Sequence, residues 1–196
     1  MQAQVRSNRD RTEKTRLTLI AAARMLFVEQ GYAETSTPEI VAAARVTRGA
    51  LYHHFEDKRA LFAAVVGEEA RAVRLEIEAA TSAGLDVLEA LLAGGDAYLD
   101  AMRTAGRTRL LLIEGPAVLG ASRMKALDEE NAARILREGL EAAIAACGQA
   151  SSAPLAALTD LLSAAFDRAA LAIEAGENDG DYRAAITTLV RRVIVS

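Results

Sequence analysis

The chain has 196 residues, enough for one average domain or two small ones. Hydrophobic residues make up 52% of it and charged residues 26%, which excludes a disordered or fibrous chain. Only 4% is aromatic and Trp is absent, so we expect an aliphatic core. The single cysteine, Cys147, excludes an intramolecular disulfide framework and a cysteine-rich zinc module, and suits a reducing compartment.

The overall charge hides a difference between the two parts of the sequence. The formal net charge is −4, but residues 1–65 hold ten Lys and Arg against seven acids, which makes that segment +3 and the remainder −7. This distribution permits a locally basic face, although ordinary scatter of charges explains it equally well. The N-terminus is polar and the apolar stretch near residues 110–113 is short, so we expect neither a signal peptide nor a membrane span, and a cytoplasmic location.

The first third of the chain predicts a basic arm over residues 1–10 and then a helix from about Thr12. Apolar residues at three- and four-residue spacing give this helix one buried stripe: Leu19, Ala22, Ala23, Leu26 and Phe27. Gly31 is placed to close it in the left-handed conformation. Ser36 and Glu39 form a capping box with Pro38 in the first turn, which predicts a short helix over residues 38–44.

A second short helix follows closely. Thr47 is its expected N-cap, and Leu51 and Phe55 share one face of the segment 48–55. Two short helices separated by about three residues form a helix-turn-helix. Asp57 then caps a longer helix that starts at Lys58. After residue 81 the pattern predicts further helices near 84–103, 106–119, 122–147, 153–177 and 180–194, so the fold class is all-α with about nine helices.

A helix-turn-helix binds DNA by placing its second helix in the major groove, which is about 12 Å wide. Arg48 stands at the start of that helix, where its guanidinium can donate twice to guanine. Gly49 and Ala50 are small enough for a close approach to the bases. Donors that suit phosphates lie near helix N-termini: Thr37, Thr47, Tyr52 and Lys58. The same pattern also occurs as a plain helical corner, and both interpretations stand at this point.

Residues 12–66 as a whole resemble the DNA-binding domain of TetR-family transcriptional repressors. The resemblance rests on Leu19-Ile20, Ala22-Ala23, Leu26-Phe27, Gly31-Tyr32, Thr35-Ser36, Ile40, Val46 through Gly49, Leu51 through Phe55, Lys58 and Leu61-Phe62. It implies a DNA-binding domain at 1–57 and a ligand-binding and dimerisation domain at 58–196. It also implies a dimeric repressor that binds a palindromic operator and is released by a small, hydrophobic ligand. The DNA contacts it implies are Thr37, Thr47, Arg48, Gly49, Ala50, Tyr52, His53, His54 and Lys58.

Arg45 departs from the family pattern, which usually has Gly at this position in the turn. The backbone there tends to positive φ, which costs a residue other than glycine on the order of 1–2 kcal/mol. Either Arg45 accepts this strain or the turn is reshaped. We include Arg45 among the candidate DNA contacts, because its charge would reach a phosphate; a solvated side chain is the alternative.

The C-terminal part carries expectations about dimerisation and ligand binding. Helices at about 153–177 and 180–194 have wide apolar faces that would close a four-helix bundle with a second copy, unless they are buried within their own domain. The expected ligand-binding residues are Tyr98, Met102, Leu111, Ile113, Glu114, Met124 and Phe166, with Ile135 as a further apolar candidate.

The sequence offers little for catalysis or metal binding. His53 and His54 are adjacent, so a helix points them in different directions and they cannot form an i, i+4 metal pair. No phosphate-binding loop or nucleophile paired with histidine is evident in the C-terminal part. We therefore expect no metal, no cofactor and no enzymatic activity. The remaining alternative is a helical ligand-binding or interaction module that no longer binds DNA.

Overall fold

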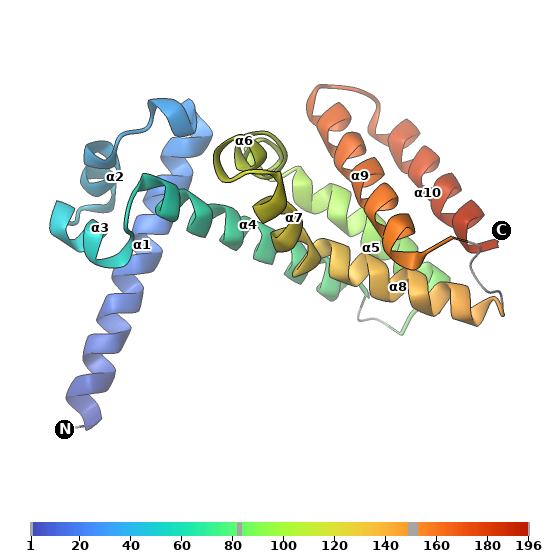
Figure 1. The fold of residues 1–196 in the computed structure, drawn as a ribbon, viewed down its shortest axis with the longest axis horizontal. Coiled ribbons are helices and arrows are strands. Elements are labelled where there is room, and N and C mark those ends of the chain that lie inside the picture. Colours follow the sequence, from blue (N-terminus) through green and yellow to red (C-terminus); the bar gives the residue numbers. More distant parts are fainter. Residues whose placement is uncertain (1, 82–83, 149–152, 196) are drawn as a thin grey trace.

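The computed structural model describes residues 2–81, 84–148 and 153–195. Over these ranges the chain forms ten α-helices and one π-helix and no strand, so the all-α prediction is confirmed. Figure 1 shows an elongated molecule, with α1, α2 and α3 at one end and α9 and α10 at the other, joined by α4. Among the described helices, none combines the length and the apolar character that crossing a membrane requires.

The first helix, α1 (Gln2–Glu34), begins about ten residues earlier than expected, so the N-terminal arm is helical. Residues 2–30 contain neither Gly nor Pro, and nothing in the sequence stops the helix from extending outward. Gly31 breaks the helical geometry, as expected, but its φ of 87° and ψ of 163° differ from the left-handed helical conformation that the sequence predicts. The Thr35 hydroxyl donates to the Gly31 carbonyl at 2.7 Å and ties the following turn to it.

The two short helices are α2 (Thr37–Ala44) and α3 (Arg48–His54), and both caps are those predicted. Ser36 and Glu39 form the capping box, and the Thr47 hydroxyl accepts a hydrogen bond from the Ala50 amide at 3.1 Å. Between the helices Arg45 has φ 54°, the one positive φ among the described residues that are not glycine. The turn is therefore not reshaped, and Arg45 itself carries the strain of the positive φ.

The next helix, α4 (Lys58–Thr81), packs against both parts of the molecule. Its first turns complete the core of the helix-turn-helix, where the ring centroids of Phe27 and Tyr32 lie 5.2 and 4.9 Å from that of Phe62. Leu19, Ile40, Leu51 and Leu61 are fully buried around these rings. The later turns of α4 pack against α5 (Val87–Met102) and α8 (Ala132–Ala146). One straight helix thus joins the two parts.

The single helix expected over 106–119 is wrong. The segment forms a π-helix, η1 (Arg109–Glu114), followed by a short α-helix, α6 (Gly115–Leu119). Pro116 has no backbone N–H, so it cannot make the bond that would continue an α-helix at this point. The Gly115 amide donates to the Leu110 carbonyl five residues back, which is the π-helical spacing.

The single helix expected over 122–147 is also wrong. The chain forms α7 (Ala121–Glu129) and α8, which are separated at Asn131, with φ −125° and ψ −108°. The Asn131 side chain donates to the Leu127 carbonyl at 2.7 Å. Asn competes in this way with the backbone hydrogen bonds of a helix, and here the competing bond accompanies the break.

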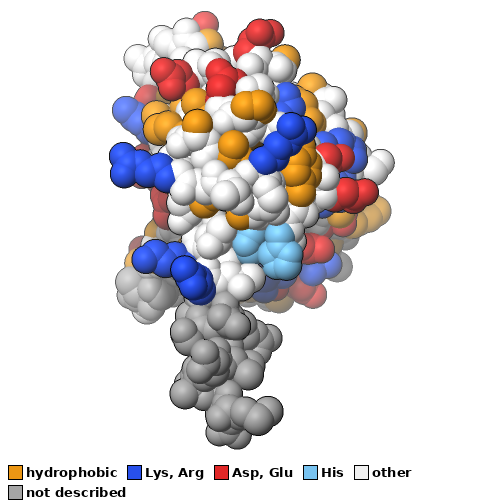
Figure 2. Space-filling view, turned by 90° about the vertical axis from the view of Figure 1, so that its left-hand side faces the viewer, with side chains coloured by type: hydrophobic (Ala, Val, Ile, Leu, Met, Phe, Trp, Pro, Cys, Tyr) orange, Lys and Arg blue, Asp and Glu red, His pale blue; other side chains and the backbone are white. Residues whose placement is uncertain are grey.

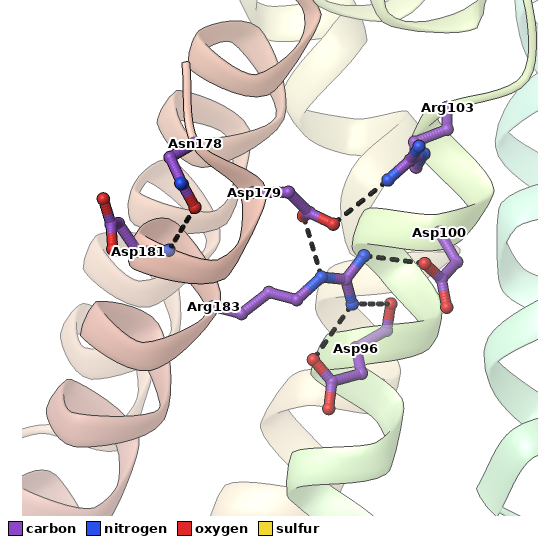
Figure 3. A network of polar contacts seen from close by, with 7 residues as sticks. All are labelled: Asp96, Asp100, Arg103, Asn178, Asp179, Asp181 and Arg183. Carbon is purple, nitrogen blue, oxygen red and sulfur yellow. Dashed lines mark hydrogen bonds and ion pairs between the residues drawn. The ribbon is translucent and has the colours of Figure 1, made fainter. Parts of the chain in front are cut away.

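The last two helices, α9 (Leu155–Glu174) and α10 (Asp179–Val195), agree with the predicted ranges within a few residues. Arg183 fixes α10 to α5 (Figure 3): its guanidinium donates to Asp96, Asp100 and Asp179 at 3.1, 2.6 and 2.8 Å. Arg103 adds a 3.0 Å bond to Asp179. This network holds the first turns of α10 against α5.

We predict that Arg45→Gly raises the free energy of unfolding by up to about 1 kcal/mol. Relief of the positive φ is worth about 1–2 kcal/mol, and the greater freedom of glycine in the unfolded chain offsets part of it. Urea denaturation measures the change. Arg45→Ala is the matched control, because it removes the same charge but keeps the strain, and it should not gain stability. Equal stabilisation by both variants would contradict the assignment to backbone strain.

Candidate nucleic-acid interface and ligand cavities

The exposed face of α3 presents an arginine and a tyrosine together. The Arg48 guanidinium carbon lies 5.5 Å from the centroid of the Tyr52 ring, and Tyr52 is 44% exposed. Hydrogen bonding with Arg48, and then with Thr37, lowers the pKa of Tyr52. Figure 2 looks onto this end: Lys and Arg side chains stand around a largely neutral centre, with the histidines beside it. Asp and Glu side chains lie at the top and at the right-hand side of the same view. The exposed Arg48 and Tyr52 supply hydrogen-bond donors that suit an anionic partner.

The two histidines extend this surface. The ring centroids of His53 and His54 are 5.2 Å apart in an edge-to-face arrangement. Burial, followed by the nearby charges of His53 and Arg16, lowers the pKa of His54. No group of metal-binding side chains is found among the described residues. His54 is partly buried beside Phe55, whereas His53 is exposed and free to contact a partner.

The other predicted contact residues surround the start of α3. Arg45, Thr47 and Gly49 are exposed, and Thr37 and Ala50 are partly exposed. A Cβ atom on Gly49 would meet no atom closer than 3.9 Å, so within the protein nothing requires glycine there. The Thr47 hydroxyl already caps α3 through the Ala50 amide. Arg45, Thr47 and Gly49 thus stand next to Arg48 along the chain, and Thr37 is within hydrogen-bonding reach of Tyr52.

The sequence predicts that Lys58 binds a phosphate, but in the structure its ammonium is bound to backbone carbonyls. Its ammonium donates to the carbonyls of Tyr32 and Thr35 at 2.8 Å each and to that of Ala33 at 3.5 Å. The same nitrogen lies 4.3 Å from the centroid of the Tyr32 ring. All three N–H groups therefore have partners on residues 32–35, which follow the break at Gly31 and are called the turn after α1 below. Lys58 ties that turn to the first turn of α4, and a phosphate would have to replace one of these carbonyls.

A buried carboxylate joins the helix-turn-helix to the rest of the molecule. Glu69 on α4 accepts from the Arg24 Nε of α1 at 2.6 Å and from the Arg107 Nε at 2.9 Å. Burial would raise the pKa of Glu69, but the hydrogen bonds from the two arginines outweigh it, so the pKa lies below its ordinary value. Arg24 also donates to the Ala105 carbonyl at 3.2 Å. Three separate segments of the chain therefore meet at one carboxylate.

The π-helix makes a second connection to the same end. Glu114 accepts from the Tyr32 amide at 3.2 Å and from Arg109 at 2.6 Å. The Arg109 guanidinium also packs against Gly31, where a Cβ atom would overlap it. Nearby, Arg59 of α4 donates to the carbonyls of Val118 and Leu119 at 3.0 and 3.2 Å. A displacement of η1 or α6 would thus reach the turn after α1 directly.

Two cavities lie among the C-terminal helices. The first, the Phe166 cavity, has a volume of about 310 Å³ and is mainly apolar. It lies between α4, α5, α8 and α9, next to the pair Gly94-Gly95. A Cβ atom on Gly95 would come within 2.8 Å of the Phe166 ring, so glycine is required for this close approach of α5 and α9.

The second cavity, the Asp167 cavity, has a volume of about 440 Å³ and contains carboxylates. The Tyr98 hydroxyl donates to Asp167 at 2.5 Å, and the Ser163 hydroxyl donates to Asp128 at 2.9 Å. Burial raises the pKa of Asp167 to about 6; the bond from Tyr98 opposes this and the charge of Asp128 adds to it. Burial also raises the pKa of Asp128 and holds that of Tyr98 well above its ordinary value.

The predicted ligand-binding residues divide between these cavities and other places. Tyr98 lines both cavities, Phe166 and Ile135 line the first, and Leu111 and Met124 line the second. The structure brings none of the other three predicted residues to either cavity: Met102 is buried in the core, Ile113 is exposed, and Glu114 bonds to Tyr32 and Arg109.

The sequence reasoning missed the polar residues of the Asp167 cavity. Asp160, Ser163 and Asp167 recur at three- and four-residue spacing, which places them on one face of α9. This spacing was a visible signal. The apolar stripe on the same helix favours a dimerisation face, and the sequence analysis predicts only that face. Asp128 gave no such signal, since the break that follows it at Asn131 was not expected.

The outer surfaces of α9 and α10 carry exposed leucines. Leu161 is 70% exposed and Leu189 is 47% exposed. In contrast, Phe166, Ile186 and Val190 of the same predicted faces are buried in the core. Each of these helices therefore has two apolar stripes. One packs against the core, and the other, which includes small residues such as Ala157 and Ala185, is exposed.

The sequence matches two family models. Residues 19–65 match the model of bacterial regulatory proteins of the tetR family, and residues 88–196 match that of a tetracyclin repressor-like C-terminal domain. The HTH-type transcriptional regulator AcrR of Shigella flexneri is 36% identical over 108 residues, which cover 55% of this chain and 50% of AcrR. The chain spans less than two thirds of the length of the curated relatives it matches.

Solved structures show the same fold over nearly the whole chain. A tetR-family transcriptional regulator from Pectobacterium atrosepticum is 30% identical, with a TM-score of 0.72 and 95% of both chains covered. The structure of RolR in complex with resorcinol has a TM-score of 0.69 at 18% identity and covers 94% of this chain and 95% of RolR. At this low identity, the similarity to RolR concerns the fold alone.

We predict that Lys58→Met lowers the free energy of unfolding by about 1–3 kcal/mol. The apolar stem is kept, but three carbonyls after α1 lose their charged donor. Urea denaturation gives the difference. Lys14→Met, an exposed substitution on α1, is the control and should stay within about 0.5 kcal/mol of the unmodified protein. An unchanged denaturation midpoint for Lys58→Met would show that these carbonyls do not depend on the lysine.

Proposed function

This chain belongs to the tetR family of bacterial regulatory proteins, and from this premise we propose a dimeric repressor that binds a palindromic operator and is released by a small hydrophobic ligand. The observation that carries the proposal is the exposed pair Arg48 and Tyr52 on α3. Residues 1–57 would form the DNA-binding domain and residues 58–196 the ligand-binding and dimerisation domain. We place the protein in the cytoplasm, where bacterial DNA lies.

Recognition of DNA would begin at the N-terminus of α3. Arg48 is exposed there and is positioned to donate to guanine in the major groove. Around it, exposed or partly exposed donors and small residues would follow the backbone: Thr37, Arg45, Thr47, Gly49, Ala50, Tyr52, His53 and His54. Lys58 would join them by exchanging its longest contact, 3.5 Å to the Ala33 carbonyl, for a phosphate oxygen.

Release by a ligand would use the contacts between the two parts. Leu111 and Leu112 of η1 line the Asp167 cavity, and Arg109 and Glu114 of the same π-helix hold the turn after α1. A ligand that shifts η1 would therefore move the helix-turn-helix relative to α4. A coupling of about 1–3 kcal/mol weakens operator binding by roughly 5–150-fold, and DNA must weaken ligand binding equally. The bound resorcinol in RolR supports a ligand site in this fold.

Dimerisation would use the open stripes of α9 and α10. Each α3 reads only a few base pairs, so tight binding needs two half-sites about 34–36 Å apart on one face of the duplex. Leu161 and Leu189 lie on these stripes, and the Arg183 network fixes α10 against α5. Phe166 is only 6% exposed, so it belongs to the core of its own subunit and not to the interface.

We predict that Arg48→Ala weakens binding to the operator by about 1–3 kcal/mol and relaxes its sequence preference at one position of each half-site. Gel shifts with duplexes that tile the DNA upstream of the gene provide the measurement at two salt concentrations. Arg137→Ala, which removes an exposed arginine of α8, is the control and should bind normally. The proposal fails if no duplex is bound with a preference for a palindrome.

We predict that Leu161→Asp produces a monomer whose operator binding is weakened, because a charge in an apolar interface is desolvated without a partner. Analytical ultracentrifugation measures the mass in solution. Leu75→Asp on α4 is the matched control, since Leu75 is 44% exposed and lies outside the proposed interface. A Leu161→Asp protein that remains dimeric would rule out this face as the contact between subunits.

A further inference from the structure

The Asp167 cavity contains two carboxylates that lack a cationic partner. Asp128 on α7 and Asp167 on α9 both line it, and each is partly buried. Their hydrogen bonds come from neutral donors only: the Tyr98 and Ser163 hydroxyls and the Ala133 amide. Among the described residues, no Lys or Arg forms an ion pair with either carboxylate. Negative charge on partly buried groups of this kind is normally paired.

The remaining charges of the cavity do not supply this partner. Lys125 and Asp160 also line it, but they form an exposed ion pair with each other at 2.6 Å. In contrast, the buried carboxylate of Glu69 forms ion pairs with both Arg24 and Arg107. The contrast between Glu69 and the pair Asp128 and Asp167 is therefore specific to the cavity.

The geometry leaves room for a donor from outside the chain. Asp167 accepts from Tyr98 through Oδ1 only, and no described group donates to its Oδ2. A carboxylate offers about four lone-pair sites, so both aspartates keep acceptor capacity after their present bonds. The volume of about 440 Å³ lies within the usual range for a small-molecule site. The other lining residues are mainly apolar, including Val73, Leu111 and Leu171.

We propose that the Asp167 cavity binds an organic cation, namely a protonated amine or related ammonium group on a hydrophobic body, with Asp128 and Asp167 as its counter-ions. This rests on the proposed function and narrows the class of its ligand. The apolar walls would hold the body of the molecule, and the two carboxylates would hold its charge. Burial raises the pKa of both groups, and a bound cation would lower it again.

The matched probes are 2-(naphthalen-2-yl)ethylamine and 2-(naphthalen-2-yl)ethanol, which have nearly the same shape. At pH 7.5 the amine is protonated and the alcohol is neutral. The chain has no Trp, so the fluorescence of the naphthyl group can be followed in titrations of the intact protein. We expect the amine to bind about tenfold more tightly than the alcohol, or more. Asp167→Asn and Asp128→Asn should each remove most of this preference while alcohol binding is retained.

Glu130→Gln on the exposed end of α7 is the control, because it removes one negative charge close to the cavity without touching it. It should leave the preference for the amine unchanged. Equal binding of both probes, or an amine preference that survives both aspartate variants, overturns the cation proposal but leaves the cavity as a site for neutral ligands. Failure of both probes to bind up to millimolar concentration also overturns it. Operator binding in gel shifts is a separate measurement, so these outcomes stay distinct from a failure of the proposed repressor function.

Discussion

The arrangement of the whole molecule depends on one buried carboxylate. Glu69 receives hydrogen bonds from Arg24 of the first helix and from Arg107, just before the π-helix. A buried charge is tolerated only when it is paired, and loss of one partner leaves it uncompensated. The contact of Glu69 with both arginines therefore specifies how the helix-turn-helix lies relative to the C-terminal helices, because separation of either arginine would leave a buried charge unpaired. Such a contact suits a protein in which the two parts must respond to each other.

The π-helix offers a physical route for the proposed response to a ligand. It lines the Asp167 cavity through Leu111 and Leu112. At its ends, Glu114 accepts from the Tyr32 amide and from Arg109, and Arg109 packs against Gly31. π-Helical turns are rare and occur frequently at functional sites. Here Pro116 removes the donor that would make the segment α-helical, so the irregular geometry is built into the sequence. A ligand in the cavity would thus contact the same six-residue segment that contacts the turn after α1.

The Asp167 cavity shows how a ligand site differs from the core around it. The buried Glu69 and Arg107 are paired with each other and with further charged groups, whereas the cavity keeps Asp128 and Asp167 next to neutral donors. This arrangement costs stability in the empty protein, because burial disfavours both ionised carboxylates. A cation that enters would offset this cost. Glu69 is paired with two arginines, whereas Asp167 accepts only from a neutral hydroxyl. This difference is the strongest structural support for the proposal that the cavity binds a cation.

The sequence by itself determined the local elements of the DNA-binding end: the capping box of Ser36 and Glu39 and the Thr47 cap. These features depend on residues only a few positions apart. Only the tertiary structure decided that Lys58 binds carbonyls after α1, that Met102 and Glu114 lie away from the cavities, and that Asp128 and Asp167 share one. Such contacts join residues from 23 to 82 positions apart, as in Lys58 with Thr35 and Glu114 with Tyr32, and no local periodicity encodes them.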